Sequence, residues 1–224
     1  MNSQIGGLEE IYKEHFGDHK GTFVEVGAFD GETNSNTCDL ADSGWSGVYI
    51  EPIVEYALLC SSRHAKNNVE VINRAVGSKR ERKTISMRGQ LTTFSVEQQV
   101  AIDVGVVFPK DWGFKAEEKA VEVQVDTLDN ILNSICVSSR SAINLNKVDL
   151  LVIDTELYED KVLEGFSIEQ WNPTMVIVEL HENSQEWQSI PRQKEITERV
   201  NGYFQWHKYK KIYVDDINTI FVQQ

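Results

Sequence analysis

Short apolar segments alternate with helix-like segments along most of this chain, and this alternation is the feature that most restricts its fold. Six segments are short and apolar, as buried strands are: 22–26, 47–51, 69–73, 119–125, 148–154 and 174–180. Helix-like segments precede or separate most of them: 5–16, 33–43, 54–65, 128–135, 159–165 and 191–201. Strands that alternate with helices predict a parallel sheet covered by helices on both faces.

Residues at the ends of these segments support the assignment. Asp126 and Thr127 are N-cap candidates for the helix at 128–135. Pro191 suits the first turn of the last helix, and Gly202 is expected to end it near Asn201. These signals give the predicted helices defined boundaries.

The C-terminal end departs from the alternation. We expect two strands, 203–209 and 219–224, joined by a hairpin turn at 215–218, which predicts an antiparallel edge. The 224 residues fit one domain, 1–224, better than two small ones. The interval at about 79–118 is irregular, and we expect an insertion there that forms a lid; a plain surface excursion is the alternative.

Composition excludes several classes of function. The chain has 22 basic and 35 acidic residues and a formal net charge of -13, which argues against a nucleic-acid partner. Cys38, Cys60 and Cys136 form no CxxC pair and suit a reducing cytoplasm. We expect a cytoplasmic protein without a signal peptide or membrane span, because no apolar run approaches about 20 residues. The sequence makes no prediction of the oligomeric state.

Carboxylates gather where the predicted strands end. Glu25 and Glu51 lie at the ends of the first two strands, and Asp154 and Glu156 follow the strand at 148–154. The strand at 174–180 contains Glu179 and is followed by His181 and Glu182. Ligands of open parallel sheets bind at the carboxyl ends of the strands. Converging carboxylates are costly unless a ligand or hydrogen bonds compensate, so we predict a polar-ligand site at this edge.

The loop after the first strand indicates which ligand binds. Gly27 and Gly31 permit a close approach of the backbone, and Glu51 lies 20 residues past Gly31, where it can hold both hydroxyls of a ribose. The G-x-x-x-G spacing departs from the G-x-G-x-x-G of dinucleotide sites. Glu25, two residues before the loop, would repel a pyrophosphate and suits a cation. S-adenosylmethionine fits these features.

The same residues resemble a known family, the FkbM-type S-adenosylmethionine-dependent methyltransferases. The similarity runs in the family's order from residue 21 to 222, and only 79–118 matches poorly. The matching segments are 23–37, 44–52, 71–78, 125–132, 148–166, 173–181, 202–206 and 218–222.

This resemblance implies an α/β, Rossmann-like class I methyltransferase domain with a seven-stranded, mostly parallel sheet. The implied strand order is 3-2-1-4-5-7-6, with the last strand antiparallel. Residues implied at the methionine end of the cofactor are Glu25, Gly27, Asp30 and Gly31, with Ser35 and Asn36 near its carboxylate. Glu51 would hold the ribose. The residues implied beside the adenine are Pro52, Asn73, Arg74 and Ala75.

Members of this family typically methylate hydroxyl groups, often on sugars or polyketide-type products. The resemblance therefore implies O-methylation of a small glycan or sugar-containing metabolite. The family's D-x-E-G-x-E element matches residues 154–159 except that Leu157 replaces the glycine. If that glycine adopts a left-handed turn, Leu157 would carry strain or force another turn.

The catalytic candidates are Asp154, Glu156 and His181. We favour His181 as the base that removes the hydroxyl proton and Asp154 as an orienting group; a strand-capping role for His181 is the alternative. Glu179 is either part of the site or a buried structural carboxylate. A divalent cation held by Asp154, Glu179 and Glu182 is possible but not favoured, so no metal ligand is predicted.

Other readings remain open at this point. Phe108, Trp112 and Phe114 in the insertion could cover a sugar face or simply anchor the insertion. The chain could also be a nicotinamide-dependent oxidoreductase on a similar sheet, although the third glycine is missing. A non-catalytic binding protein of the same fold is the third reading, and Leu157 is the feature that suggests it.

Overall fold

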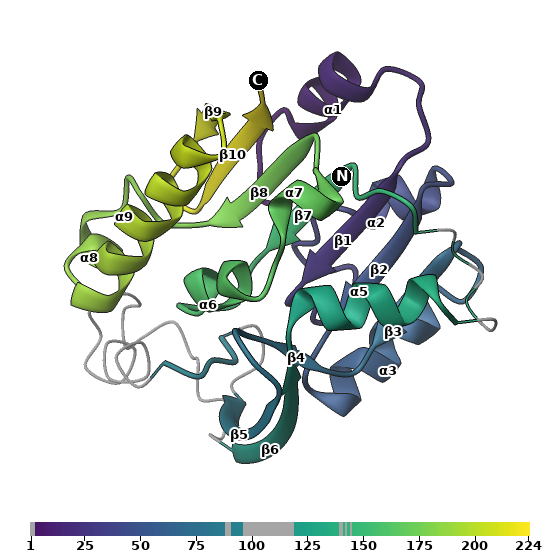
Figure 1. Cartoon of the computed structure of the whole chain (residues 1–224), viewed down its shortest axis with the longest axis horizontal. Coiled ribbons are helices and arrows are strands. Elements are labelled where there is room, and N and C mark those ends of the chain that lie inside the picture. Colours follow the sequence, from purple (N-terminus) through teal and green to yellow (C-terminus); the bar gives the residue numbers. More distant parts are fainter. Residues whose placement is uncertain (1–2, 88–90, 96–118, 139–140, 142, 144) are drawn as a thin grey trace.

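A computed structural model describes residues 3–87, 91–95, 119–138, 141, 143 and 145–224. Its centre is a seven-stranded sheet with helices on both faces (Figure 1). The strands, in spatial order, are β3 (Val69–Ile72), β2 (Ser46–Ile50), β1 (Thr22–Val26), β7 (Leu150–Ile153), β8 (Met175–Glu179), β10 (Asn218–Gln223) and β9 (Tyr209–Val214).

The expected strand order is confirmed. Counted within this sheet alone, the strands lie in the order 3-2-1-4-5-7-6. The neighbouring strands β3, β2, β1, β7 and β8 pair in parallel. Strand β10 is antiparallel to both of its neighbours, β8 and β9. The carboxyl ends of β1, β2, β7 and β8 therefore meet at one edge, as the parallel arrangement requires.

A separate three-stranded sheet accounts for the remaining strands. It has the order β4 (Ala75–Val76), β6 (Lys119–Asp126), β5 (Glu81–Met87), with β5 and β6 antiparallel. The predicted strand at 119–125 thus belongs to this small sheet and not to the main one. The beginning of the interval 79–118 is also regular rather than irregular, because β5 pairs along its length with β6.

Segments 88–90 and 96–118 lie outside the described residues. The predicted lid falls mainly there, and so do Phe108, Trp112 and Phe114. The lid and the single-domain boundary 1–224 therefore stay predictions.

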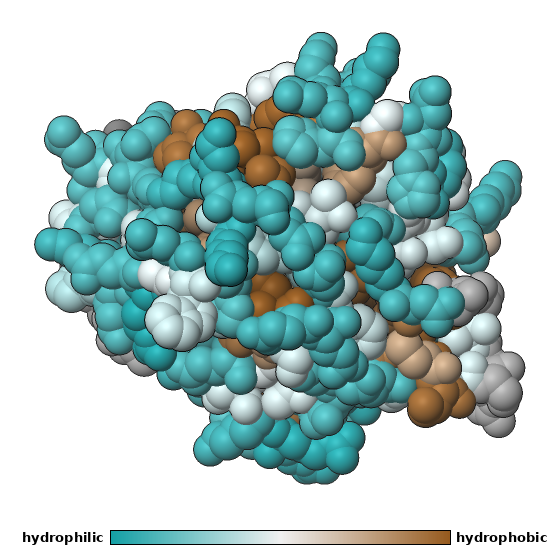
Figure 2. Space-filling view, turned by 45° about the horizontal axis from the view of Figure 1, so that its top comes forward, coloured by the Kyte–Doolittle hydropathy of each residue, from teal (hydrophilic) through white to brown (hydrophobic). Residues whose placement is uncertain are grey.

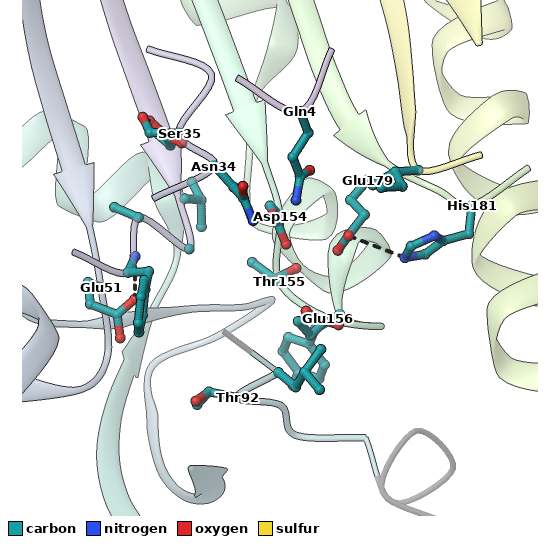
Figure 3. Close-up of a pocket in the computed structure, with 18 of the residues that line it drawn as sticks. Gln4, Asn34, Ser35, Glu51, Thr92, Asp154, Thr155, Glu156, Glu179 and His181 are labelled. Carbon is teal, nitrogen blue, oxygen red and sulfur yellow. Dashed lines mark hydrogen bonds and ion pairs between the residues drawn. The ribbon is translucent and has the colours of Figure 1, made fainter. Parts of the chain in front are cut away.

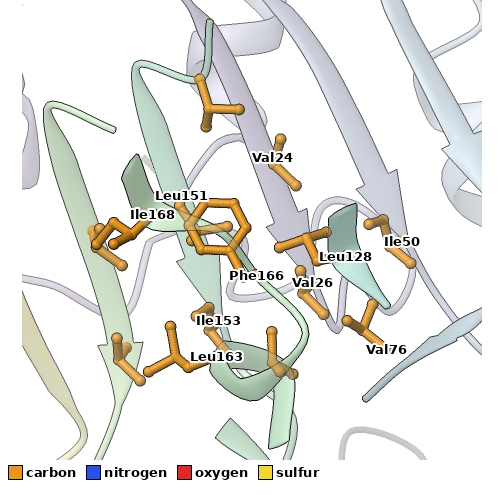
Figure 4. Packing of buried hydrophobic residues seen from close by; sticks show 14 of the residues in the cluster. Val24, Val26, Ile50, Val76, Leu128, Leu151, Ile153, Leu163, Phe166 and Ile168 are labelled. Carbon is orange, nitrogen blue, oxygen red and sulfur yellow. The ribbon is translucent and has the colours of Figure 1, made fainter. Parts of the chain in front are cut away.

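Alternation along the strands divides the core into two layers. On one face, residues such as Val24 and Val26 pack under α5 (Leu128–Cys136), α6 (Glu159–Glu164), α7 (Ile168–Trp171) and α9 (Pro191–Trp206), as Figure 4 shows in part. On the other face, Phe23 and Tyr49 pack under α1 (Leu8–Phe16), α2 (Cys38–Asp42) and α3 (Val54–Arg63). A short helix, α8 (Gln185–Gln188), precedes α9. Glu25 lies between Val24 and Val26 in sequence, so it belongs to the second face.

Two predicted helices have different bounds. The helix expected at 33–43 is reduced to α2, because the Asp30 side chain accepts hydrogen bonds from the backbone N–H groups of Glu32 and Thr33 and holds them in a loop. The helix expected to end at Asn201 continues to Trp206, so the strand predicted at 203–209 is wrong. Phe204 extends the buried stripe of Ile196 and Val200 at intervals of four residues, which favours helix over strand.

Local capping agrees with the sequence at one place. The Thr127 side chain accepts a hydrogen bond from the Asn130 N–H, so Thr127 is the N-cap of α5.

Most of the face seen in Figure 2 is hydrophilic, in keeping with the charge of -13. Among the described residues, no helix is both long and apolar enough to cross a membrane.

Candidate functional site

A cavity of about 670 Å³ opens at the carboxyl edge of the main sheet. Its wall contains the residues that end β1, β2, β7 and β8, together with parts of the loop after β1, the small sheet and α8 (Figure 3). Members of the predicted site that line it are Glu25, Gly27, Ser35, Glu51, Pro52, Arg74, Ala75, Asp154, Glu156 and His181. The residues predicted from the strand ends therefore share one cavity, and their roles in binding and catalysis stay predictions.

Glu51 is held in place by the backbone. Its Oε2 accepts a hydrogen bond from the Phe29 N–H at 3.0 Å, and its Oε1 accepts one from the Ile53 N–H at 2.7 Å. Burial raises the pKa of this carboxyl to about 7 despite these two bonds. The carboxylate is thus fixed at one end of the cavity, and each oxygen keeps a lone pair for a further donor.

Glu25 is buried beside the cavity and bound by side chains. Its Oε2 accepts hydrogen bonds from Ser35 Oγ at 2.8 Å and from Thr37 Oγ1. Burial raises the pKa of Glu25 to about 7, although both hydroxyls favour the ionised form. Because Glu25 faces the α2 side of the sheet, it supports the loop that contains Ser35 as well as bordering the cavity.

The structure shows a reason for glycine at positions 27 and 31 that the sequence did not indicate. Both have positive φ angles, +88° and +75°. A Cβ on Gly27 would lie 1.6 Å from the carbonyl oxygen of Asp154, and one on Gly31 would lie 2.6 Å from Cys60 Sγ. The glycines therefore allow the chain to pass close to its own atoms, which places the β1 loop directly against the end of β7.

Four predicted cofactor residues, Asp30, Gly31, Asn36 and Asn73, do not line the cavity. Asp30 closes its own turn, and Asn36 accepts a hydrogen bond from Ser3 Oγ at 2.8 Å. Asn73 donates from Nδ2 to the carbonyl oxygens of Glu51 and Pro52, each at 2.9 Å. These residues shape the loops of the site rather than its surface.

The opposite end of the cavity holds a cluster of carboxylates with one imidazole. Oxygen atoms of Asp154, Glu156 and Glu179 lie within 4.8 Å of one another. His181 Nε2 lies 3.2 Å from Glu179 Oε1, and His181 Nδ1 lies 3.1 Å from the carbonyl oxygen of Asp216. All three carboxylate side chains come from the ends of β7 and β8, so the parallel pairing of these strands brings them together.

The charges in this cluster depend on one another. Burial and the charge of Glu179 raise the pKa of Asp154 well above its usual range. Burial disfavours ionised Glu179 most strongly, but the facing His181 and a hydrogen bond with Asp154 together hold the pKa of Glu179 below its usual value. Glu179 in turn raises the pKa of His181 against the effect of burial. The favoured state is therefore a protonated Asp154, an ionised Glu179 and an imidazolium that donates from both nitrogens.

Glu159 adds a fourth buried carboxylate behind this cluster. Its Oε1 accepts hydrogen bonds from the N–H and the Oγ1 of Thr155, both at 3.1 Å. Its Oε2 has no hydrogen-bond partner among the residues that the structure describes. Burial, followed by the charge of Glu179, raises the pKa of Glu159 to about 7.

Leu157 does adopt the left-handed conformation that the sequence suggested. Its φ is +70°, next to Glu156 with a φ of +55°. The Leu157 side chain is 3% exposed and belongs to the core under α5, α6, α7 and α9. Burial of a leucine is worth about 1.5–3 kcal/mol, which offsets the roughly 1 kcal/mol or more of a left-handed non-glycine residue.

The cation reading included Glu182, and the structure excludes Glu182 from this cluster. Its carboxylate contacts Lys211 Nζ at 2.6 and 2.7 Å and accepts a hydrogen bond from Asn201 Nδ2 at 3.0 Å. Glu182 lies in the turn that follows β8 and does not line the cavity, whereas its neighbour His181 does.

Sequence reasoning missed several polar and aromatic residues of the wall, among them Gln4, Asn34 and Trp187. Trp187 stacks on the His181 ring with 4.1 Å between centroids and 2° between planes. Trp187 lies between the strand predicted at 174–180 and the helix predicted at 191–201, where the sequence carries no sign of this stack. Gln4 precedes the first predicted helix, where no sequence signal distinguishes a site residue from a disordered terminus.

Comparisons with known proteins agree with this fold. A model of the family described as "Methyltransferase FkbM domain" matches residues 25–211. A methyltransferase FkbM from Methylobacillus flagellatus KT is similar in structure, with a TM-score of 0.53 and 14% identity over 91% of this chain and 44% of that chain. An O-methyltransferase from Bacillus cereus, solved with SAH, has a TM-score of 0.50 and 13% identity over 96% of this chain and 79% of that one. A comparison with curated protein sequences finds no match.

The family match spans well over half of the chain, so the chain belongs to the FkbM methyltransferase family. It corresponds to 44% of the length of the Methylobacillus protein. The two solved structures share the α/β fold with its seven-stranded, mostly parallel sheet.

Proposed function

We propose that this chain is an S-adenosylmethionine-dependent O-methyltransferase that acts on a hydroxyl of a small glycan or sugar-containing metabolite. The observation that carries the proposal is the division of one cavity into two ends. Glu51 presents fixed carboxylate oxygens at one end, and Asp154, Glu156 and Glu179 form a proton-exchanging cluster at the other. Membership of a methyltransferase family supports the reaction class.

The residues of the cavity fit the proposed cofactor. Glu51 can accept hydrogen bonds from a ribose diol, and Ala75 with Ile85 offers apolar surface on the same side for an adenine. Ser35, in the loop that follows β1, also lines the cavity, and the amino-acid part of S-adenosylmethionine would lie beside it. A volume of about 670 Å³ lies in the range of small-molecule sites and leaves space for an acceptor.

When bound, S-adenosylmethionine supplies a methyl group on a sulfonium, which an acceptor oxygen takes by in-line displacement while the carbon–sulfur electron pair returns to sulfur. The chain has to position the acceptor and remove its proton. We assign the proton to a carboxylate oxygen of Asp154. A positive charge in the cavity favours ionised Asp154. Once methyl transfer removes that charge, burial and Glu179 raise the pKa of Asp154 again, so it retains the proton of the acceptor.

This assignment exchanges the roles that the sequence suggested for Asp154 and His181. Both nitrogens of His181 are engaged, one with Glu179 and one with the Asp216 carbonyl, so the ring has no free lone pair for an acceptor hydroxyl. We assign His181 to positioning Glu179. Glu156, on the cavity wall, is suited to accept a hydrogen bond from a second hydroxyl of a sugar.

Calorimetry with S-adenosylhomocysteine and with NAD tests the cofactor. We expect binding of the first and not of the second; binding of NAD alone would point to an oxidoreductase and end the proposal. The acceptor is tested with S-adenosylmethionine tritiated at the methyl group and a panel of neutral sugars, methyl glycosides and their deoxy analogues, together with small amines and thiols. Label transferred to a sugar, and lost with one particular hydroxyl, supports the proposal. Label transferred only to nitrogen or sulfur acceptors contradicts O-methylation.

A further inference from the structure

The segment from Ser3 to Gly7, here called the N-terminal strap, is attached to the loop that follows β1. Ser3 forms a parallel bridge with Asn34, and Ser3 Oγ donates to Asn36 Oδ1 at 2.8 Å. The Ile5 N–H donates to Ser3 Oγ at 3.0 Å, and the Ile5 side chain is 3% exposed in the core under α1, α2 and α3. The strap therefore has a fixed position against the cofactor end of the cavity.

Gln4 lies between these two anchors and faces the other way. Its side chain lines the cavity and, in Figure 3, extends from the strap toward Asp154 and Asn34. Its Oε1 accepts a hydrogen bond from Asn218 Nδ2 at 3.3 Å, at the start of β10. Asn218 is 2% exposed, so its amide is held in place. Because the oxygen of Gln4 is used by Asn218, its Nε2 is the atom left to face the cavity.

The charges around Gln4 call for such a donor. Arg74 is the one Lys or Arg among the described residues of the cavity wall, and it lies with Pro52 and Ala75 on the side assigned to the adenine. Glu25 and Asp154 offer acceptors for an ammonium group but repel a carboxylate. A ligand with an amino-acid end therefore needs neutral N–H donors for its carboxylate, and the Gln4 amide is one of them.

We propose that Gln4 is a cofactor-binding residue whose Nε2 donates a hydrogen bond to the α-carboxylate of S-adenosylmethionine. This inference rests on the proposed function. It lies outside the family match, which begins at residue 25, so the carboxylate subsite is completed by a segment that precedes the methyltransferase family match. Gln4 thereby distinguishes cofactors that carry an amino-acid end from nucleosides that lack one.

The test compares two ligands by calorimetry. S-adenosylhomocysteine carries the carboxylate, and 5′-deoxy-5′-methylthioadenosine has the same nucleoside and thioether without the amino acid. We expect Gln4→Ala to weaken binding of the first by about 3- to 10-fold, the net worth of one ordinary hydrogen bond. Gln4→Glu should weaken it by more than about 10-fold through repulsion between carboxylates. Binding of methylthioadenosine should stay within about twofold in both variants.

Gln124→Glu is the matched control, because Gln124 is exposed on β6 and does not line the cavity. It adds the same charge and should leave both affinities unchanged. Thermal melting by circular dichroism checks that each variant is folded. The inference is overturned if Gln4→Glu binds S-adenosylhomocysteine like the wild type, or if both ligands weaken equally, which would make Gln4 structural. Wild-type protein that binds neither ligand would instead overturn the proposed function.

Discussion

The two ends of the cavity hold their carboxylates in different ways. Glu51 is fixed by two backbone N–H groups, from Phe29 and Ile53, whose positions are set by the loops. Asp154 and Glu179 face each other and the His181 imidazole, all of them side chains that can gain or lose protons. Backbone donors fix a carboxylate for binding, whereas titratable partners let charge move between neighbours. This difference supports our proposal that the first end binds the cofactor and the second transfers a proton.

The strongest test of this division is Asp154→Asn. An amide cannot accept the hydroxyl proton, so we expect kcat for methyl transfer to the best sugar of the panel to fall by about 10²–10⁴-fold. Affinity for S-adenosylhomocysteine, measured by calorimetry, should change by less than about threefold. Glu182→Gln is the control, since Glu182 pairs with Lys211 away from the cavity. Unchanged kcat in Asp154→Asn would remove Asp154 from the proton-transfer step.

The opposite pattern is expected for Glu51→Ala. Loss of the ribose contacts should lower the affinity for S-adenosylhomocysteine by about 10- to 100-fold, with a smaller effect on kcat at saturation. The variant also leaves the N–H groups of Phe29 and Ile53 without their acceptor, at a cost of about 1–3 kcal/mol in the free energy of unfolding. Urea titration measures this cost. Wild-type affinity in a folded variant would show that Glu51 does not hold the ribose.

His181→Gln tests whether His181 acts through Glu179. Without the imidazolium, the Asp154–Glu179 pair must carry its negative charge unassisted, so its protons should leave at higher pH. We expect the acidic limb of kcat/KM to move upward by about one pH unit, with Glu159 adding to the repulsion. A purely structural role would lower activity without moving the limb. An unshifted limb would therefore contradict the positioning role.

Much of this arrangement could be predicted from the sequence, because it follows from the alternation of strands and helices and from the place of the carboxylates at the strand ends. Parallel strands bring their carboxyl ends to one edge, so Glu51, Asp154 and Glu179 could be placed together from spacing alone. The extension of α9 past Gly202 could not be predicted in this way. Gly202 is exposed and does not interrupt the helix, and the helix continues because Phe204 is buried in the core.

The remaining differences arise from long-range contacts. The need for glycine at position 27 comes from Asp154, which is distant in sequence. Gln4 reaches the cavity through anchors at Asn34, Asn36 and Asn218. Our proposal of Asp154 rather than His181 as the base depends on the carbonyl oxygen of Asp216, which engages the second nitrogen of His181. Such contacts have no local pattern in the sequence.

Glu25 gives the smallest expected effect and sharpens the comparison, because its pKa of about 7 equals that of Glu51 although its partners are the hydroxyls of Ser35 and Thr37. A folded-state pKa above the unfolded value means that the folded protein binds more protons, so this contribution to stability is present below about pH 4.5 and is lost as the pH rises through 7.

Glu25→Gln keeps an oxygen for both hydroxyls and removes the titration. Its amide nitrogen faces the Asn36 N–H, which limits the gain. We expect the variant to be more stable than the wild type at pH 8 by on the order of 1 kcal/mol, and not at pH 4, in urea titrations. An equal difference at both pH values would mean that Glu25 does not titrate in this range, and a raised pKa would then no longer be a feature that Glu25 and Glu51 share.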